Sequence, residues 1–236
     1  CSAVECIDSS ECASSDSCYA ASCEDFVCVE TPIDSPLCCF PGADDSLTMD
    51  FEGGAGWDSA TCTPGDGSMG DASSVWQVSG ATAGITPTEG AMMLYFGNGT
   101  DYGGDVLTDA SAMASCGTTD SPEFVLNPAE TWTLEFDLYL GIEANPNCAG
   151  GAAFASDDVF TISVIDYSNA GAETLLFDKS EMNCGDFGDW ASVSIDLDDW
   201  SGQSIGLRFA FDSGNAYVND GPGIAVDNMQ FVKGCE

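Results

Sequence analysis

The chain has 236 residues, of which 40 are acidic and only 3 are Lys or Arg, so its formal net charge at pH 7 is −37. Such a charge repels nucleic-acid phosphates and anionic lipid headgroups, which argues against nucleic acid and membrane surfaces as partners. The sequence contains no histidine. The usual general base and the Ser-His and Cys-His catalytic pairs are therefore missing.

Cysteine usage divides the chain into two regions. Eight of the 13 cysteines lie in residues 1–41, among small and acidic residues that are too poor in large apolar side chains to form a core. Disulfide bonds are a better interpretation of these cysteines than a zinc site, because histidine is absent and the cysteines do not occur in the paired C-x₂-C motifs that are typical of zinc sites. We therefore predict a small disulfide-stabilised module over 1–41, a second domain over 42–236, and a secreted or cell-surface location.

From residue 42 the hydrophobic period is two, which is typical of half-buried β-strands. TWTLEFDLYL places Trp132, Leu134, Phe136, Leu138 and Leu140 on one face, and QSIGLRFAF, WASVSIDL and DVFTISVIDY repeat this alternation. Further strands are expected over 47–52, 74–78, 91–96, 173–177 and 223–232. Because Gly, Asn, Asp and Pro clusters separate them and no helical stripe occurs, we predict an all-β antiparallel jelly-roll β-sandwich.

The order of segments over 49–232 resembles that of MAM and concanavalin-like jelly-roll domains of bacterial secreted proteins. The segments are FEGGAGW, WQV, AMMLYFGNG, TWTLEFDLYLGIE, SIDLDDWSGQSIGLRFAFDSG and GIAVDN. The resemblance implies an adhesive, carbohydrate-binding or structural domain that is not catalytic. It also implies a calcium position joining the first strand to the last, which falls here on Asp50, Glu52 and Asp227. Upstream, CVETPIDSPLCC resembles Cys-rich modules of secreted proteins from environmental bacteria and implies a spacer or stalk.

Calcium takes six to eight oxygen ligands, mostly carboxylates and carbonyls. Asp50 and Glu52 are two residues apart, so both should leave one face of a strand, and Asp227 comes alongside them if the terminal strands pair. Alternatively, these are three solvated acids among 40. A second group of oxygen-bearing side chains lies in one turn, at Asp212, Asn215, Asn219 and Asp220.

A β-sandwich of this composition could act on sugars in two ways, by binding a glycan or by hydrolysing one. Exposed aromatic rings beside polar side chains favour glycan binding, and the candidates in or beside predicted loops are Trp57, Trp190, Trp200, Tyr102 and Tyr217. Alternatively, each of these rings could be buried and close one end of the hydrophobic core. A glycosidase needs two carboxylates, and Glu135 and Asp137 share a strand face, but Tyr139 stands where jelly-roll glucanases carry a third acid.

Two disulfides can be predicted within the second domain. Cys148 and Cys184 both lie in loops that flank the strands DVFTISVIDY and ETLLFD, which favours their pairing. Cys62 and Cys116 lie in Gly/Ser/Thr-rich loops and would pair next.

The remaining cysteines raise a question of parity. Cys235 follows the last strand and reaches back to Cys38 or Cys39 if that strand neighbours the first. Because 13 is odd, one cysteine must be free, modified or bonded to another chain. Cys1 is the candidate, either as a lipid-anchored N-terminus or as a link to a neighbouring subunit.

These patterns together predict a non-enzymatic extracellular protein with a structural or adhesive role. It would be stabilised by calcium and able to join its own subunits in a surface fibre or array. The alternative is a carbohydrate-binding module of a secreted protein, whose partner is a glycan.

Overall fold

The computed structural model describes residues 12, 19–32, 42–43, 47–49, 51–53, 56–64, 71–104, 112–128, 130–144, 148 and 158–234. This part of the chain consists of strands, short 3₁₀ turns and loops, and it contains no α-helix. The predicted all-β class is confirmed. In the described residues, no helix is long and apolar enough to cross a membrane.

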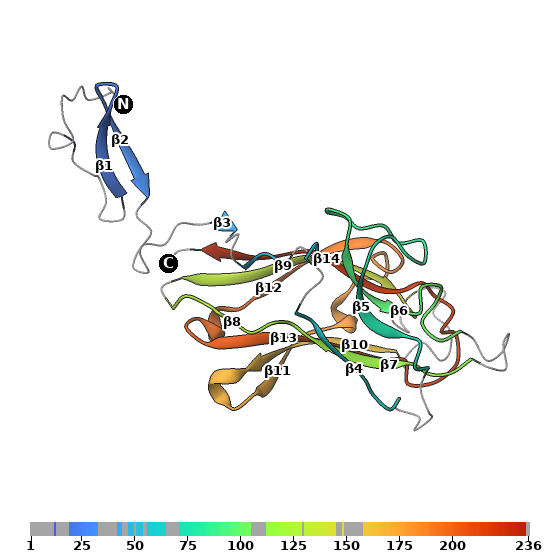
Figure 1. Cartoon of the computed structure of the whole chain (residues 1–236). Helices are drawn as coiled ribbons and strands as arrows, with labels where there is room; N and C mark the ends of the chain where they lie inside the picture. The colour runs from blue at the N-terminus through green and yellow to red at the C-terminus, as the bar shows by residue number, and fades with distance from the viewer. Residues whose placement is uncertain are drawn as a thin grey trace.

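Two antiparallel sheets pack face to face as a β-sandwich (Figure 1). The first sheet has the order β11-β10-β13-β7-β4, with β8 paired to β13. Its strands are β4 (Asp58–Thr61), β7 (Cys116–Asp120), β8 (Phe124–Val125), β10 (Val159–Asp166), β11 (Ala172–Asp178) and β13 (Ser204–Asp212).

The second sheet has the order β12-β9-β14-β6-β5, with β3 paired to β14. Its strands are β3 (Gly42–Ala43), β5 (Val75–Ser79), β6 (Met93–Gly97), β9 (Thr131–Gly141), β12 (Trp190–Asp196) and β14 (Gly223–Gly234). Strands β11 and β12 each end their sheet, and they lie on the same side of the sandwich (Figure 1).

The core lies between the sheets and follows from the period-two alternation. On β9 the inward residues Trp132, Leu134, Phe136, Leu138 and Leu140 are all 2% exposed or less. From the opposite sheet, Phe160 of β10 and Phe209 of β13 reach the same core and are completely buried. The predicted inward faces of these three strands are therefore confirmed.

The predicted strand over 47–52 does not form. Met49 makes a single antiparallel bridge with Met229, and Phe51 has a φ of 61° and leads into a turn. The Phe51 ring packs on Trp57 with ring centroids 5.5 Å apart. Its apolar character thus reflects core packing and not strand pairing.

The sequence pattern does not predict strands β4 and β7, because their residues are mostly small and polar and show no apolar alternation. They form through pairing: Asp58–Thr61 lies beside β7, and β7 lies beside β13. Tertiary hydrogen bonding outweighs local propensity here.

In the N-terminal region, β1 (Tyr19–Glu24) and β2 (Val27–Pro32) form an antiparallel hairpin. Asp25 and Phe26 between them both have positive φ, at 48° and 65°, as a two-residue hairpin turn of type I′ requires. A disulfide joins Cys12 to Cys28, and Cys23 is also disulfide-bonded. The predicted module thus contains strands as well as cross-links.

Both disulfides predicted within the second domain are present. Cys62 is bonded to Cys116 and Cys148 to Cys184, with Cα–Cα distances of 5.4 and 5.3 Å. The other predicted linkage residues, Cys1, Cys38, Cys39 and Cys235, lie outside the described residues.

Candidate functional site: a groove between two sheet edges

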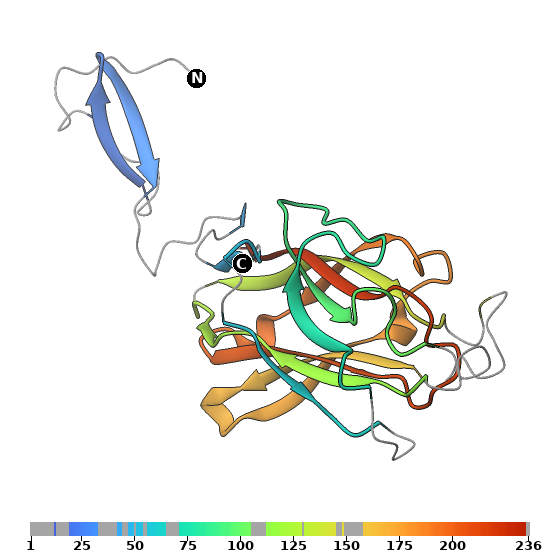
Figure 2. The same cartoon turned by 45° about the vertical axis from the view of Figure 1, so that its right-hand side comes forward.

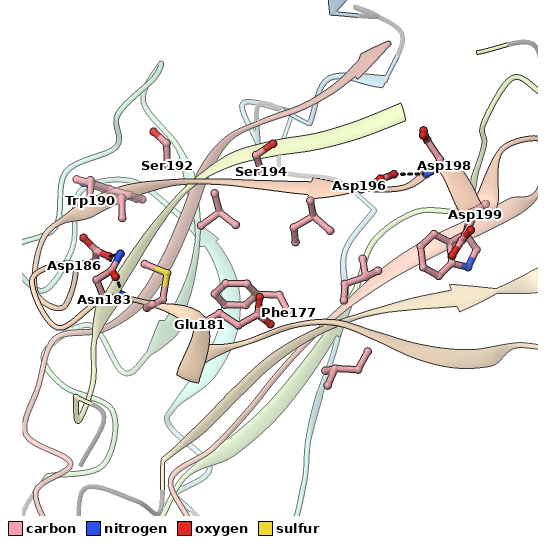
Figure 3. Close-up of a pocket in the computed structure, with 17 residues that line it drawn as sticks. Phe177, Glu181, Asn183, Asp186, Trp190, Ser192, Ser194, Asp196, Asp198 and Asp199 are labelled. Carbon is pink, nitrogen blue, oxygen red and sulfur yellow. Dashed lines mark hydrogen bonds between the residues drawn. The ribbon is translucent and has the colours of Figure 1, made fainter. Parts of the chain in front are cut away.

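A groove of about 860 Å³ lies between the edge strands β11 and β12 (Figure 3). It is bounded by residues 175–177 of β11, by 190–196 of β12, and by the turns at 181–186 and 198–200. The groove exists because both sheets end on the same side of the sandwich, so that no further strand of the described chain closes the space between them.

The floor of the groove is apolar. On β12, Val193 and Ile195 point between the sheets and pack on the core, and Phe177 and Met182 do so from the β11 side. Figure 3 shows Ser192 and Ser194 turned away from this floor. Because side chains alternate between the two faces of a strand, Val193 and Ile195 point inward. They do so on the edge strand of the sheet, where no neighbouring strand of the described chain covers them on the outer edge. They therefore pack on the core only in part.

Carboxylates form much of the rim, at Glu181, Asp186, Asp196, Asp198 and Asp199. Several of them hold the local turns. Asp186 Oδ2 accepts from the backbone N–H and the side chain of Asn183, both at 3.0 Å, and Asp198 Oδ1 accepts from the backbone N–H of Trp132 at 2.7 Å. No Lys or Arg is among the described residues that line the groove. Its electrostatic potential is therefore negative.

Two tryptophans line the groove, one at the start of β12 and one after its end: Trp190 is the first residue of the strand, and Trp200 lies in the 3₁₀ turn Asp198–Trp200 that follows it. Trp190 donates from Nε1 to the backbone carbonyl of Thr86 at 3.1 Å, and its ring lies edge-on to Tyr139 at 5.7 Å. Trp200 packs against the main core. Both residues are partly exposed and line the groove.

The other three predicted aromatic platforms lie elsewhere. Trp57 is a core plug, packed on Phe51 and on Phe209. Tyr102 is fully buried, with its hydroxyl 2.9 Å from Asp158 Oδ2; burial, and then the Asp158 charge, raises the pKa of Tyr102 far above its ordinary value. Tyr217 is 40% exposed but does not line the groove. Of the five predicted rings, the structure brings together only Trp190 and Trp200.

The carboxylates Glu135 and Asp137 lie on the outer face of β9, where they line a smaller hollow of about 310 Å³. Asp137 accepts hydrogen bonds from Ser192 Oγ and Thr88 Oγ1, both at 2.9 Å. Ser192 and Ser194 border both the hollow and the groove. The two depressions therefore meet across β12.

The predicted calcium ligands anchor a single loop segment. Asp227 is fully buried, and its Oδ2 accepts from the backbone N–H groups of Thr88 and Glu89 at 2.6 and 3.0 Å. Glu52 Oε1 accepts from the N–H groups of Ala91 and Met92, at 2.5 and 2.9 Å. Asp50 lies outside the described residues, in which no group of three metal-ligating side chains occurs.

Three members of the second oxygen-rich group make local hydrogen bonds. Asp212 Oδ1 accepts from the N–H of Gly214, and Asn215 Oδ1 accepts from that of Tyr217. Asn219 donates to the backbone carbonyl of Asn215 at 2.7 Å, which closes the turn. Asp220 is exposed beside it.

Sequence reasoning finds both groove tryptophans but not the groove. The floor residues carry the ordinary signature of inward strand residues, and nothing in the sequence shows which strands end a sheet. The nearest available signal is the sequence Asp198-Asp199-Trp200, which places two acids and an indole directly after a strand.

The sequence matches no protein-family model and no curated protein. Among solved structures, the fold is similar to the CBM22-1 xylan-binding domain of Xyn10C from Paenibacillus barcinonensis, at 13% identity and a TM-score of 0.42, covering 83% of this chain and 97% of that one. It is also similar to the K3 cleaved adhesin domain of Lys-gingipain from Porphyromonas gingivalis, at 13% identity and a TM-score of 0.44, covering 79% and 98%. At such identities and TM-scores the likeness carries no function over to this chain.

Proposed function

We propose that this chain is a secreted, non-enzymatic carbohydrate-binding module that holds a glycan in the groove between β11 and β12. The observation that carries the proposal is the pair of partly exposed tryptophans, Trp190 and Trp200, that line one groove. Aromatic side chains with an apolar body suit the apolar faces of sugar rings, and the polar rim suits their hydroxyl groups.

The size and polarity of the groove support this function. Its volume of about 860 Å³ lies within the range of roughly 300–1,000 Å³ that is usual for small-ligand sites. Asn183 and the rim carboxylates offer both donors and acceptors to hydroxyl groups. The disulfides support the secreted location, because such bonds persist in oxidising compartments.

The experiment that tests the proposal is the substitution Trp200→Ala. A glycan array first identifies a ligand, and calorimetry then compares the two proteins. We expect the variant to lose about 2 kcal/mol of binding free energy, or about 30-fold in affinity, because a buried tryptophan contact is a typical binding hot spot. Tyr217→Ala is the matched control, since Tyr217 is an exposed aromatic residue outside the groove.

Two results would contradict the proposal. One is an array covering neutral, acidic and amino polysaccharides on which the wild-type protein binds nothing. The other is a ligand whose affinity is the same for wild type, Trp200→Ala and Trp190→Ala.

An adhesive role is compatible with this proposal, because a glycan-binding domain at a cell surface adheres through its ligand. The lipid anchor and the subunit linkage both depend on Cys1, which lies outside the described residues. Assembly into a fibre or array therefore stays a prediction.

We also propose a structural calcium ion near Asp227. This carboxylate is fully buried, and its Oδ1 has no hydrogen-bond partner in the described part of the chain. A buried negative charge of this kind fits a cation, and Asp50 would have to supply further oxygens.

Calcium should accordingly raise the melting temperature of chelator-treated protein, because an ion that binds only the folded state stabilises it by mass action. Thermal unfolding across millimolar Ca²⁺ measures this. Sodium chloride at matched ionic strength serves as the control for simple screening of the −37 charge. If Ca²⁺ and sodium chloride at matched ionic strength raised the melting temperature equally, the proposal of a specific calcium site would be wrong.

A further inference from the structure

The connection between β5 and β6 runs over the outer side of the second sheet (Figure 2). Ile85 from this connection joins Met93, Tyr95 and Ala225 in a buried cluster separate from the main core. Tyr139 and Trp190 pack on the edge of the cluster. The groove tryptophan Trp190 therefore belongs to two surfaces, the groove and the contact with this loop.

Asp227 fixes the loop from below. Its Oδ2 accepts from the backbone N–H groups of Thr88 and Glu89, at 2.6 and 3.0 Å, and lies 3.1 Å from the Thr88 hydroxyl, whose single proton it shares with Asp137. The carboxylate is inaccessible to solvent. A buried polar group is costly unless it is hydrogen-bonded, and residues 88–89 supply the hydrogen bonds to Oδ2, so Asp227 and this part of the loop hold each other in place.

Two hydrogen-bond paths lead from this anchor to β12, and the first of them reaches the groove. In the first, Thr86, two residues before Thr88, accepts from Trp190 Nε1 through its backbone carbonyl at 3.1 Å. In the second, Thr88 Oγ1 lies 2.9 Å from Asp137 Oδ2, and Asp137 Oδ1 accepts from Ser192 Oγ. Trp190 lines the groove, whereas the Ser192 hydroxyl is turned away from the groove floor toward Asp137.

We propose that Asp227 is a positioning residue for the groove: its buried carboxylate holds residues 86–89, and these hold Trp190 in place. This inference deepens the proposed function and rests on it for the ligand, but the contact between loop and Trp190 can be tested without any ligand. Asp227 touches no groove ligand itself, because it lies beneath the loop and does not line the groove.

The test is Asp227→Asn, which keeps the shape of the side chain and removes its charge. Acrylamide quenching of tryptophan fluorescence is measured in this variant and in Asp227→Asn/Trp190→Phe, and the difference reports Trp190 alone. The same subtraction between wild type and Trp190→Phe gives the reference. We expect Trp190 to become more accessible to quencher. Affinity for the array-identified glycan should fall by about tenfold, the order expected when a charge-assisted hydrogen bond is removed.

Thr88→Val is the second variant, in case Asp227→Asn does not fold. It removes only the hydroxyl that lies between the two carboxylates, and should change Trp190 quenching in the same direction. Asp71→Asn is the control, because Asp71 also closes a turn, but it does so by accepting from Ser73 and Ser74, its neighbours in the chain.

The outcomes separate the two proposals. Unchanged Trp190 quenching in both Asp227→Asn and Thr88→Val overturns the positioning role, whatever the glycan data show. If Trp190 quenching changes in these variants but the wild-type protein binds no glycan, the positioning role is supported and the proposed function is wrong. Equal quenching changes in Asp71→Asn and Asp227→Asn would also overturn the inference, since the effect would then be general destabilisation.

Discussion

Phe209→Ala is expected to lower the free energy of unfolding by about 3–5 kcal/mol, the range for truncating a buried phenylalanine. Phe209 is completely buried, and its ring lies 5.7–6.5 Å from the rings of Trp57, Trp76, Phe136 and Phe160. These neighbours are large, flat side chains from both sheets and the loop before β4. Because they cannot close over the cavity, nothing replaces the dispersion attraction that the phenyl ring supplied.

Urea unfolding followed by circular dichroism measures this destabilisation, with the m-value checked for constancy. Val125→Ala on β8 is the control, because Val125 is 62% exposed and its truncation should change stability by no more than about 0.5 kcal/mol. A decrease below about 1 kcal/mol in Phe209→Ala would mean that the two sheets do not pack through this ring.

Removing either disulfide of the sandwich is expected to cost about 4 kcal/mol in the chain-entropy model. The bonded residues are 54 positions apart in Cys62–Cys116 and 36 apart in Cys148–Cys184. Because the entropy depends only on the logarithm of loop length, the two decreases in stability should be nearly equal. The double variants Cys62→Ala/Cys116→Ala and Cys148→Ala/Cys184→Ala therefore form a matched pair.

Their effects on glycan binding should differ. Cys184 lies between Asn183 and Asp186, which line the groove and bond to each other. Only the Cys148→Ala/Cys184→Ala variant should bind the glycan identified on the array more weakly, as measured by calorimetry below the unfolding transition. Equal affinity in both variants would show that the 183–186 turn takes no part in binding.

Much of the fold follows from local pattern, and the failures have physical causes. The long strand TWTLEFDLYL is predictable because five large apolar residues alternate without a break. Residues 47–52 also contain apolar side chains, but Phe51 serves the core from a turn, and periodicity cannot separate these two uses. Strands β4 and β7 are small and polar, so only their neighbours in the sheet make them strands.

The candidate site is predictable only in fragments. Trp190 and Trp200 stand out because indoles at strand ends are often exposed, yet Trp57 has the same signature and fills the core. Only a family resemblance singles out Asp227, as a calcium ligand. Its hydrogen bonds to Thr88 and Glu89 join positions 139 and 138 apart in the chain, and no local pattern reports such a contact.

The sequence by itself determined the class of this protein. Charge argues against nucleic-acid partners, cysteine density indicates oxidising surroundings, and period-two alternation specifies two sheets with an apolar interior, because each of these depends on composition or on neighbouring residues. Only the tertiary structure decided that β11 and β12 end their sheets on the same side. The order of strands depends on long-range pairing, and that order places Trp190 and Trp200 along one groove.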